Sequence, residues 1–273
     1  MSKSNSITRT ITGLLYGLAL ITSLTVNFYT FYIFFFIVLV LGLKEFYQLA
    51  EKKDIIPQKN LGFIISFGLY ISSYLIYVNE KMSYFILNII LALTFMLFAV
   101  ELFKIKEISF VNIGITILGV IYVALPLSLL TFLAFDTSNQ YSYNLILSLF
   151  ILVWLSDVGG YFAGINFGKH KLLERISPKK TWEGVAGGLI LCIIGSYILS
   201  HFFQIMNVYT WLVFGVLVCV SSVIGDLIES MLKRSANIKD SGNILPGHGG
   251  ILDRFDSVLF AIPIVYIFKF FIL

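Results

Sequence analysis

The sequence predicts an all-α, polytopic integral membrane protein with about nine transmembrane helices. Of its 273 residues 58% are hydrophobic and only 12% are charged, and the mean hydropathy is +0.92. An average soluble domain is nearer half apolar and a quarter charged, so these charges are too few to cover a soluble core. The 26 phenylalanines and 15 tyrosines exclude a disordered chain. The two cysteines, Cys192 and Cys219, lie in apolar runs and are too few for a disulfide scaffold.

Nine apolar runs are long enough to cross a bilayer, which takes about 20 residues of helix. The first block, residues 11–43, is too long for one helix, and Asn27 marks a turn between two. The remaining spans are predicted at 61–78, 84–103, 108–135, 143–162, 184–205, 209–231 and 257–273. Pro126 is expected to kink the fifth span, since a helix bundle tolerates proline in its interior.

The basic residues test this number of spans. With nine spans, 17 of the 19 lysines and arginines fall on the side of the N-terminus, and only Lys81 and Lys269 fall on the other. Positively charged loops mark the cytoplasmic side of a membrane protein. We therefore expect a multi-pass protein of the cell membrane whose N-terminus and basic loops are cytoplasmic.

The two halves of the chain differ in polar content. Residues 1–140 hold apolar helices and short connectors, and they are interpreted as a transmembrane scaffold in which residues 44–59 form a solvated interfacial segment. Residues 141–273 are the predicted catalytic region, with cytoplasmic loops at 163–183 and 232–256. An ionised side chain within a span is costly and indicates function by default.

The first polar cluster begins late in the sixth span. Ser156 and Asp157 lie in the cytoplasmic half of that span, and five basic residues follow in the next loop, among them Lys179 and Lys180. Such a loop suits phosphates or anionic lipid headgroups. The positive-inside bias alone would also place lysines there, so both interpretations stay open.

The second polar cluster closes the eighth span. Offsets of three and four residues place Ser222, Glu229 and Ser230 on the helical face of Asp226. Two acids and two hydroxyls on one face of a spanning helix are hard to explain by packing. Ser222 and Ser230 are expected to orient the acids.

The densest polar stretch covers residues 233–256. At a helical start Asp253 and Asp256 would face the same way, and with Asp226 they offer the oxygen ligands that Mg²⁺ takes alongside substrate phosphates. The groups expected to bind a polyphosphate are the side chains of Lys233, Arg234, Lys239, His248 and Arg254 and the backbone N–H groups of Gly247, Gly249 and Gly250. This combination indicates metal-assisted phosphoryl or nucleotidyl transfer. The sequence has no G-x-S-x-G, no G-x-x-x-x-G-K-[ST] and no zinc-ligand spacing of its histidines.

The same stretch carries a longer pattern, Ser230-x-Leu232-Lys233-Arg234-x4-Lys239-Asp240-x-Gly242-x2-Leu245-Pro246-x-His248-Gly249-Gly250-Ile251-x-Asp253-Arg254-Phe255-Asp256. This run resembles the signature of the phosphatidate cytidylyltransferase family, also called CDP-diacylglycerol synthases. Upstream, Ser156-Asp157 and Ser177-Pro178-x-Lys180-Thr181-x-Glu183-Gly184 resemble that family too, which adds Thr181 and Glu183 to the substrate-binding candidates. The resemblance is sharp from about residue 156 to residue 256 and general before that.

The resemblance implies a homodimeric membrane enzyme of phospholipid biosynthesis, a nucleotidyltransferase that converts CTP and phosphatidic acid to CDP-diacylglycerol and pyrophosphate. It implies dependence on Mg²⁺, with a monovalent cation such as K⁺ nearby. The lipid phosphate would attack the α-phosphorus of CTP directly. The expected metal ligands are Asp226, Asp253 and Asp256, and Lys233, Arg234, Lys239, His248 and Arg254 complete the expected catalytic set.

Three alternatives are weighed against this function. A CTP-dependent enzyme acting on another lipid or a polyprenol phosphate would share the catalytic residues and differ only in its lipid pocket. An ion-coupled transporter would spread polar residues over several spans or repeat its halves, whereas here they gather at one end of the spans. A purely structural membrane protein leaves residues 233–256 unexplained.

Overall fold

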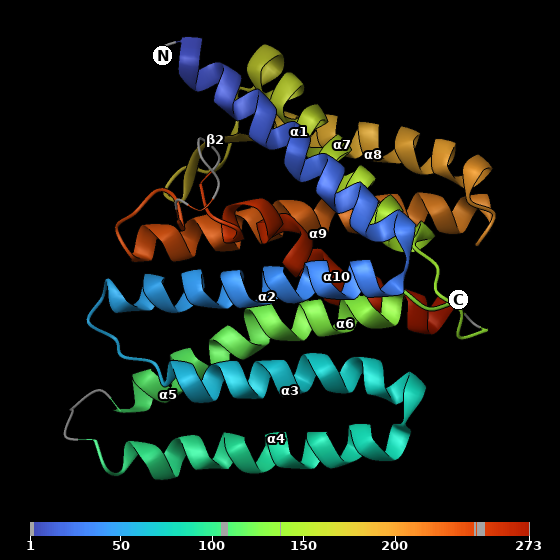
Figure 1. The fold of residues 1–273 in the computed structure, drawn as a ribbon. Helices are drawn as coiled ribbons and strands as arrows, with labels where there is room; N and C mark the ends of the chain where they lie inside the picture. The colour runs from blue at the N-terminus through green and yellow to red at the C-terminus, as the bar shows by residue number, and fades with distance from the viewer. Residues whose placement is uncertain (1–2, 105–108, 137, 243, 245–248, 273) are drawn as a thin grey trace. The chain divides into compact units, whose positions relative to one another are not determined.

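In the computed structural model the chain is almost wholly helical, which confirms the predicted all-α class. The structure describes residues 3–104, 109–136, 138–242, 244 and 249–272, with side chains from Thr12 onward. The described helices are α1 Lys3–Val26, α2 Phe28–Glu51, α3 Lys59–Val78, α4 Glu80–Glu101, α5 Ser109–Gly119, the π-helical turn η1 Val120–Ala124, α6 Leu125–Leu133, α7 Asn144–Phe167, α8 Trp182–Phe202, α9 Val208–Ser235 and α10 Leu252–Ile272 (Figure 1). Between α7 and α8, the strands β1 Lys171–Leu173 and β2 Ser177–Thr181 form an antiparallel hairpin that was not predicted.

The chain is a multi-pass membrane protein. In the part that the structure describes, eight helical segments are long and apolar enough to cross a membrane, with α5, η1 and α6 together forming one of them. They match the predicted spans two to nine. The first predicted span, from residue 11 to the turn at Asn27, falls within α1, where the apolar run among the described side chains is Thr12–Val26.

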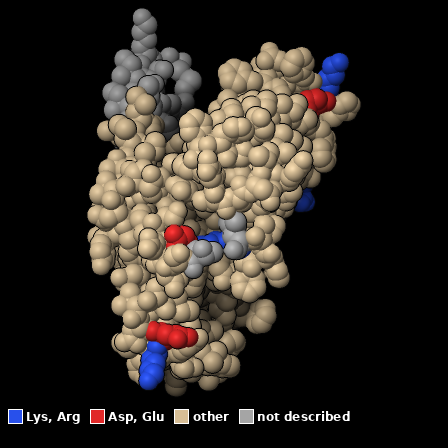
Figure 2. Space-filling view, turned by 90° about the vertical axis from the view of Figure 1, so that its right-hand side faces the viewer, with Lys and Arg blue, Asp and Glu red and all other residues tan. Residues whose placement is uncertain are grey.

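Large apolar side chains stand exposed along these helices, among them Phe95, Phe110 and Tyr209. The face of the molecule in Figure 2 is correspondingly almost free of charged side chains. A soluble protein rarely exposes apolar surface on this scale. A bilayer removes the difficulty, because lipid tails cover apolar side chains and the helices satisfy their own backbone groups.

Both helix breaks that the sequence predicts are present. Asn27 is the N-cap of α2: its Oδ1 accepts the N–H of Thr30 at 2.9 Å, and the Thr30 hydroxyl accepts the N–H of Asn27 at 3.3 Å. This reciprocal capping box separates α1 from α2. Pro126 is the second residue of α6, which follows η1. At this junction the N–H of Leu125 bonds the carbonyl of Val120, one residue further back than in an α-helix. Such π-helical turns are a known cause of helix bending.

The chain divides into two compact units. The first comprises residues 1–135 and 236–254, and the second comprises residues 136–235 and 255–273. Residues 236–254, most of the densest polar stretch, group with the N-terminal helices.

In the first unit, Tyr47 of α2 ties α2 to α3 and α5. Its side chain is fully buried, and its hydroxyl donates to the carbonyl of Thr116 at 3.0 Å. The ring occupies the space that side chains at Gly62 and Gly119 would need: a Cβ at Gly119 would lie 2.6 Å from the ring. The packing of α2, α3 and α5 therefore depends on the Tyr47 ring and on glycine at positions 62 and 119.

A buried carboxylate joins the ends of α4 and α5 in the same unit. Glu101 is 4% exposed and accepts hydrogen bonds from Gln58 at 2.5 Å, Asn112 at 2.9 Å and Lys104 at 2.9 Å. These donors compensate the cost of burying the acid.

In the second unit, glycines bring α7 and α8 into backbone contact. A Cβ at Gly159 would lie 2.6 Å from the carbonyl oxygen of Gly187, and one at Gly184 would lie 2.9 Å from that of Gly160. Small residues at such spacing let membrane helices approach closely. The glycines of α7 therefore serve helix packing, which holds the start of α8 against α7.

We predict that Gly119→Ala destabilises the protein, because the new methyl group must displace the buried ring of Tyr47. Overpacking of this kind costs about 1–3 kcal/mol, seen as a lower thermal midpoint in detergent. Gly114→Ala is the matched control on α5, since a Cβ there would meet nothing within 4 Å. Equal midpoints for the two variants would contradict the packing of Tyr47 described above.

Candidate active site

Two residues of the first polar cluster fix the base of the hairpin. The Thr181 hydroxyl caps α8 by accepting the N–H of Gly184 at 3.1 Å. The Glu183 carboxylate accepts the N–H groups of Lys169 at 3.1 Å and His170 at 3.2 Å, and Nδ1 of His170 lies 2.6 Å from its Oε1. In this structure Thr181 and Glu183, predicted as substrate-binding residues, shape the hairpin that carries the lysines.

Lys180 connects this hairpin to α9. Its Nζ lies 2.5 Å from Oδ2 of Asp226, and the Ser230 hydroxyl donates to Oδ1 of the same carboxylate at 3.3 Å. As predicted, Ser230 orients an acid. The side chains of Lys180 and Asp226 are 26% and 31% exposed, so a ligand can reach this ion pair. The neighbouring Lys179 is exposed.

The backbones of α9 and α10 touch beside Asp226, and this contact places Asp256. A Cβ at Gly225 would lie 2.7 Å from the carbonyl oxygen of Asp256 and 3.0 Å from Cα of Ser257. Only glycine fits between the helices at this point. Asp256 interacts electrostatically with Asp226 and accepts the N–H of Ser257 at 2.6 Å. Carboxylates from two different helices therefore lie near one another.

The charges around this pair are mostly negative. Asp157 of α7 also interacts electrostatically with Asp256, and Lys233 offsets part of the repulsion. Lys233 itself forms an ion pair with the buried Glu229, one helical turn earlier in α9. Several carboxylates near one another favour the binding of a cation.

Ser156 and Ser222 join α7 to α9. Their hydroxyls lie 3.2 Å apart, and that of Ser222 also lies 2.9 Å from the carbonyl oxygen of Cys219. Both serines are buried. Ser222 was expected to orient an acid; these bonds instead hold two helices together, because its side chain faces α7.

In the first unit, Asp253 organises residues 236–254, which we call the signature segment. Its Oδ2 accepts the N–H of Gly250 at 2.7 Å, and the N–H and hydroxyl of Ser241 at 2.9 Å and 3.0 Å. Gly249 has a φ of +83°, and a Cβ there would lie 2.6 Å from the same oxygen. The N–H of Gly250, predicted to cradle a phosphate, is thus bonded to Asp253 in this structure.

Glu45 of α2 is a residue that the sequence analysis missed. It is 1% exposed and accepts the N–H groups of Ile251 at 3.0 Å and Leu252 at 2.9 Å, and the Ser241 hydroxyl at 3.1 Å. Residues 44–59 were interpreted as a solvated segment, which is wrong here because α2 continues to Glu51. The signal was present: an acid at the end of an apolar run falls under the rule that singled out Asp157.

The remaining candidates are distributed as follows. Arg234 at the end of α9 is exposed, and so are Lys239 and Arg254 in the signature segment. Gly247 and His248 lie outside the described residues. Of the three predicted metal ligands, Asp226 and Asp256 belong to the second unit, and Asp253 belongs to the first. Among the described side chains, no three of His, Cys, Asp or Glu are grouped closely enough to hold a metal ion.

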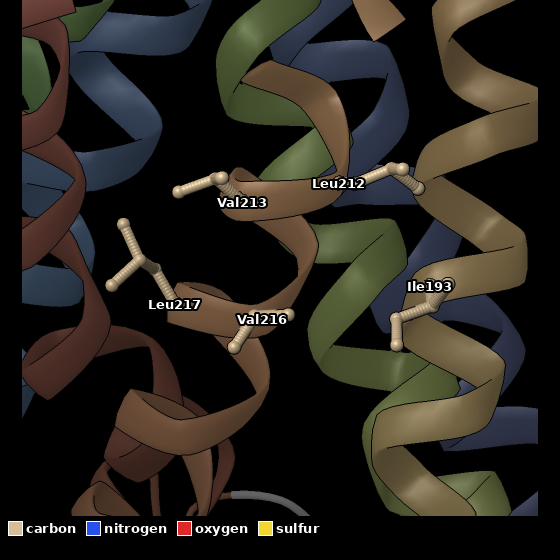
Figure 3. Close-up of a pocket in the computed structure, with 5 residues that line it drawn as sticks. All are labelled: Ile193, Leu212, Val213, Val216 and Leu217. Atoms are coloured by element: carbon tan, nitrogen blue, oxygen red, sulfur yellow. The ribbon is translucent and has the colours of Figure 1, made fainter. Parts of the chain in front are cut away.

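An apolar groove of about 310 Å³ lies between α8 and α9 (Figure 3). Its lining residues are Ile193 of α8 and Leu212, Val213, Val216 and Leu217 of α9. The nearest of these to Asp226 in sequence is nine residues away, about 13 Å along a helix. A lining without polar groups suits hydrocarbon and not a nucleotide, so the chemistry belongs at the polar helix ends.

Known proteins resemble this chain along most of its length. The cytidylyltransferase family matches residues 7–272 of the chain. The phosphatidate cytidylyltransferase of Staphylococcus haemolyticus is 33% identical over 261 residues, 95% of this chain and 97% of the relative. That of Bacillus subtilis is 37% identical over 188 residues, 68% and 67% of the two chains. The match to the Haemophilus influenzae enzyme, 46% identical over 134 residues, spans about half of each chain. The chain belongs to the cytidylyltransferase family.

Proposed function

We propose that this protein is a phosphatidate cytidylyltransferase, which makes CDP-diacylglycerol and pyrophosphate from CTP and phosphatidic acid. The observation that carries the proposal is the accessible ion pair of Lys180 and Asp226, with the carboxylate of Asp256 near it, among apolar helices. A nucleotide from water and a phosphate from a lipid can both reach such a position. The relatives that share the family bear this activity in their names.

Asp226 and Asp256 fit a Mg²⁺ ion. This ion is usually held by one or two carboxylates while substrate phosphates and waters complete its shell, so two acids suffice. When bound, it would neutralise phosphate charge. The exposed Asp157 adds negative charge to the site. A monovalent cation such as K⁺ nearby, and Asp253 as a third ligand, are part of the proposal on the strength of the resemblance.

Lys180 would exchange partners during the reaction. In the structure it neutralises Asp226. With Asp226 engaged as a metal ligand, the Lys180 ammonium group would be available to contact a phosphate oxygen of CTP. The exposed basic side chains of Lys179, Arg234, Lys239 and Arg254 are further candidates for phosphate contacts.

The bond changes are simple. An oxygen of the lipid phosphate attacks the α-phosphorus of CTP, and the bond from that phosphorus to the bridging oxygen of the β-phosphate breaks. Pyrophosphate carries away the negative charge of the leaving group. The attacking phosphate is already an anion near neutral pH, so the chain needs to supply positioning and charge neutralisation, not a strong base.

The proposal places this site at the cytoplasmic face of the cell membrane, in a homodimer. The distribution of 17 of 19 basic residues to one side of the predicted spans supports the orientation. The homodimer rests on the resemblance alone.

The function is tested with purified protein, labelled CTP, Mg²⁺ and phosphatidic acid in mixed micelles. We expect a lipid-soluble cytidine product with an equal amount of pyrophosphate, and loss of both when EDTA removes the metal. A polyprenyl phosphate serves as the second lipid. Product from that lipid alone would support the alternative substrate, and no product from either would refute the proposal.

We predict that Asp256→Asn lowers kcat by about 100-fold or more and raises the Mg²⁺ concentration for half-maximal rate, because one metal ligand loses its charge. Membrane insertion should be unchanged. Asp54→Asn is the matched control, since Asp54 is exposed and its φ of 58° suits asparagine. Full activity of Asp256→Asn would exclude the metal-ligand role.

Lys180→Gln should lower kcat/KM for CTP by about 10- to 100-fold, since a phosphate loses its cationic partner. The KM for phosphatidic acid should change less. Lys53→Gln, at an exposed lysine of the α2–α3 connection, is expected to behave like the parent protein. Steady-state kinetics with each substrate varied in turn measures the difference, and equal losses for both substrates would argue against a nucleotide contact.

A further inference from the structure

We infer that Glu45 is a positioning residue for the reaction: its buried carboxylate fastens the signature segment and the start of α10 to α2. The inference rests on the proposed function for what the segment does. Its structural part is that the Glu45 carboxylate bonds residues some 200 positions away in the sequence, an arrangement that we call the clasp. This part rests on contacts within the first unit alone.

The clasp holds the segment at two places. Oε1 of Glu45 accepts the N–H of Ile251, and Oε2 accepts the N–H of Leu252 and the hydroxyl of Ser241. The first two donors belong to the free N-terminal end of α10, where an anion is favoured by the helix dipole and by unpaired N–H groups. Ser241 lies on the other side of the residues that the structure leaves undescribed. One carboxylate therefore bonds both described ends of the segment.

The glycines of the segment make room for this carboxylate. A Cβ at Gly242 would lie 2.5 Å from Oε1 of Glu45, and a Cβ at Gly250 would overlap Oε2. Of these two glycines, Gly250 was predicted to serve the phosphates of the substrate. In the structure both glycines serve Glu45, since the backbone must approach the acid closely for the hydrogen bonds to form.

Stability alone does not explain an acid at this position. A buried charge rarely gains stability over apolar side chains of similar size, because desolvation offsets the interactions it makes. The packing of α2 already rests on Tyr47 and on a core that includes Phe35, Leu39 and Leu43. The carboxylate instead sets the orientation of the signature segment relative to α2, since an acceptor with two oxygens can bond two N–H groups and a hydroxyl at once.

The consequence for the site runs through α10. Asp253 shares the Ser241 hydroxyl with Glu45 and bonds the N–H of Gly250, so the two acids hold the same turn of chain. Asp256 follows three residues later on the same helix. A loosened start of α10 would leave both aspartates less well oriented, although Glu45 itself touches no substrate.

The test compares Glu45→Gln with Glu51→Gln, the same substitution at an exposed acid of α2 that pairs with Lys59. We expect Glu45→Gln to lower kcat by about tenfold or more, with the KM for phosphatidic acid within about twofold, because the amide nitrogen cannot accept a hydrogen bond. Hydrogen–deuterium exchange should accelerate in peptides covering 241–254 and stay unchanged in α3 and α4. Glu51→Gln should match the parent protein in both measurements.

Two outcomes overturn the inference. Parental kcat and parental exchange in Glu45→Gln would show that the clasp positions nothing. Faster exchange throughout the first unit, with a lowered thermal midpoint, would show a merely structural role. If the parent protein itself makes no product from CTP and phosphatidic acid, the proposed function fails while the exchange data still decide whether the clasp exists.

A second pair of variants tests the same contact by a substitution in the signature segment. This pair also covers the case in which Glu45→Gln does not fold. Gly242→Ala should lower kcat by pushing its methyl group against the carboxylate. Glu45→Asp withdraws that carboxylate by one methylene, so the double variant should recover part of the activity that Gly242→Ala loses. Strictly additive losses would refute a direct contact between the two residues.

Discussion

An ionised acid on an apolar helix must find hydrogen-bond donors within the protein, and much of this structure follows from where those donors come from. Glu45 takes them from the start of α10, and Glu101 takes them from Gln58 before α3 and from Asn112 in α5. Asp226 takes a lysine from the hairpin. Each acid thereby ties together segments that are distant in the sequence. These charged residues therefore connect distant segments of the fold, and some of them are also candidates for the chemistry.

Close backbone contact between helices also determines the fold, and it depends on glycine. The contacts at Gly159 and Gly184 set α8 beside α7, and the contact at Gly225 sets α10 beside α9. Because α8 carries the hairpin at its start and α10 carries Asp256, these contacts decide which polar side chains meet. Among the described residues, glycine works mainly by having no side chain, and Gly249 is the one glycine with a left-handed backbone.

The site in the second unit has the character of a resting state. Lys180 neutralises Asp226, and Asp256 stands beside them with an incompletely balanced charge. The proposed phosphates and divalent cation are opposite in sign, as Lys180 and Asp226 are, so they could replace this internal pairing with external pairing.

The sequence by itself determined the class of the protein. Hydropathy is a sum over neighbouring residues, so the spans, the break at Asn27 and the interruption at Pro126 follow from local composition. The signature pattern likewise determined the family, because fixed spacing survives without knowledge of the fold. Only the tertiary structure decided the role of individual polar residues. That Glu45 bonds Leu252, that Thr181 and Glu183 support a hairpin, and that Ser222 faces α7 all depend on contacts between distant segments. The partner of a hydrogen bond is set by packing in space, and a linear pattern carries no distance between residues 45 and 252.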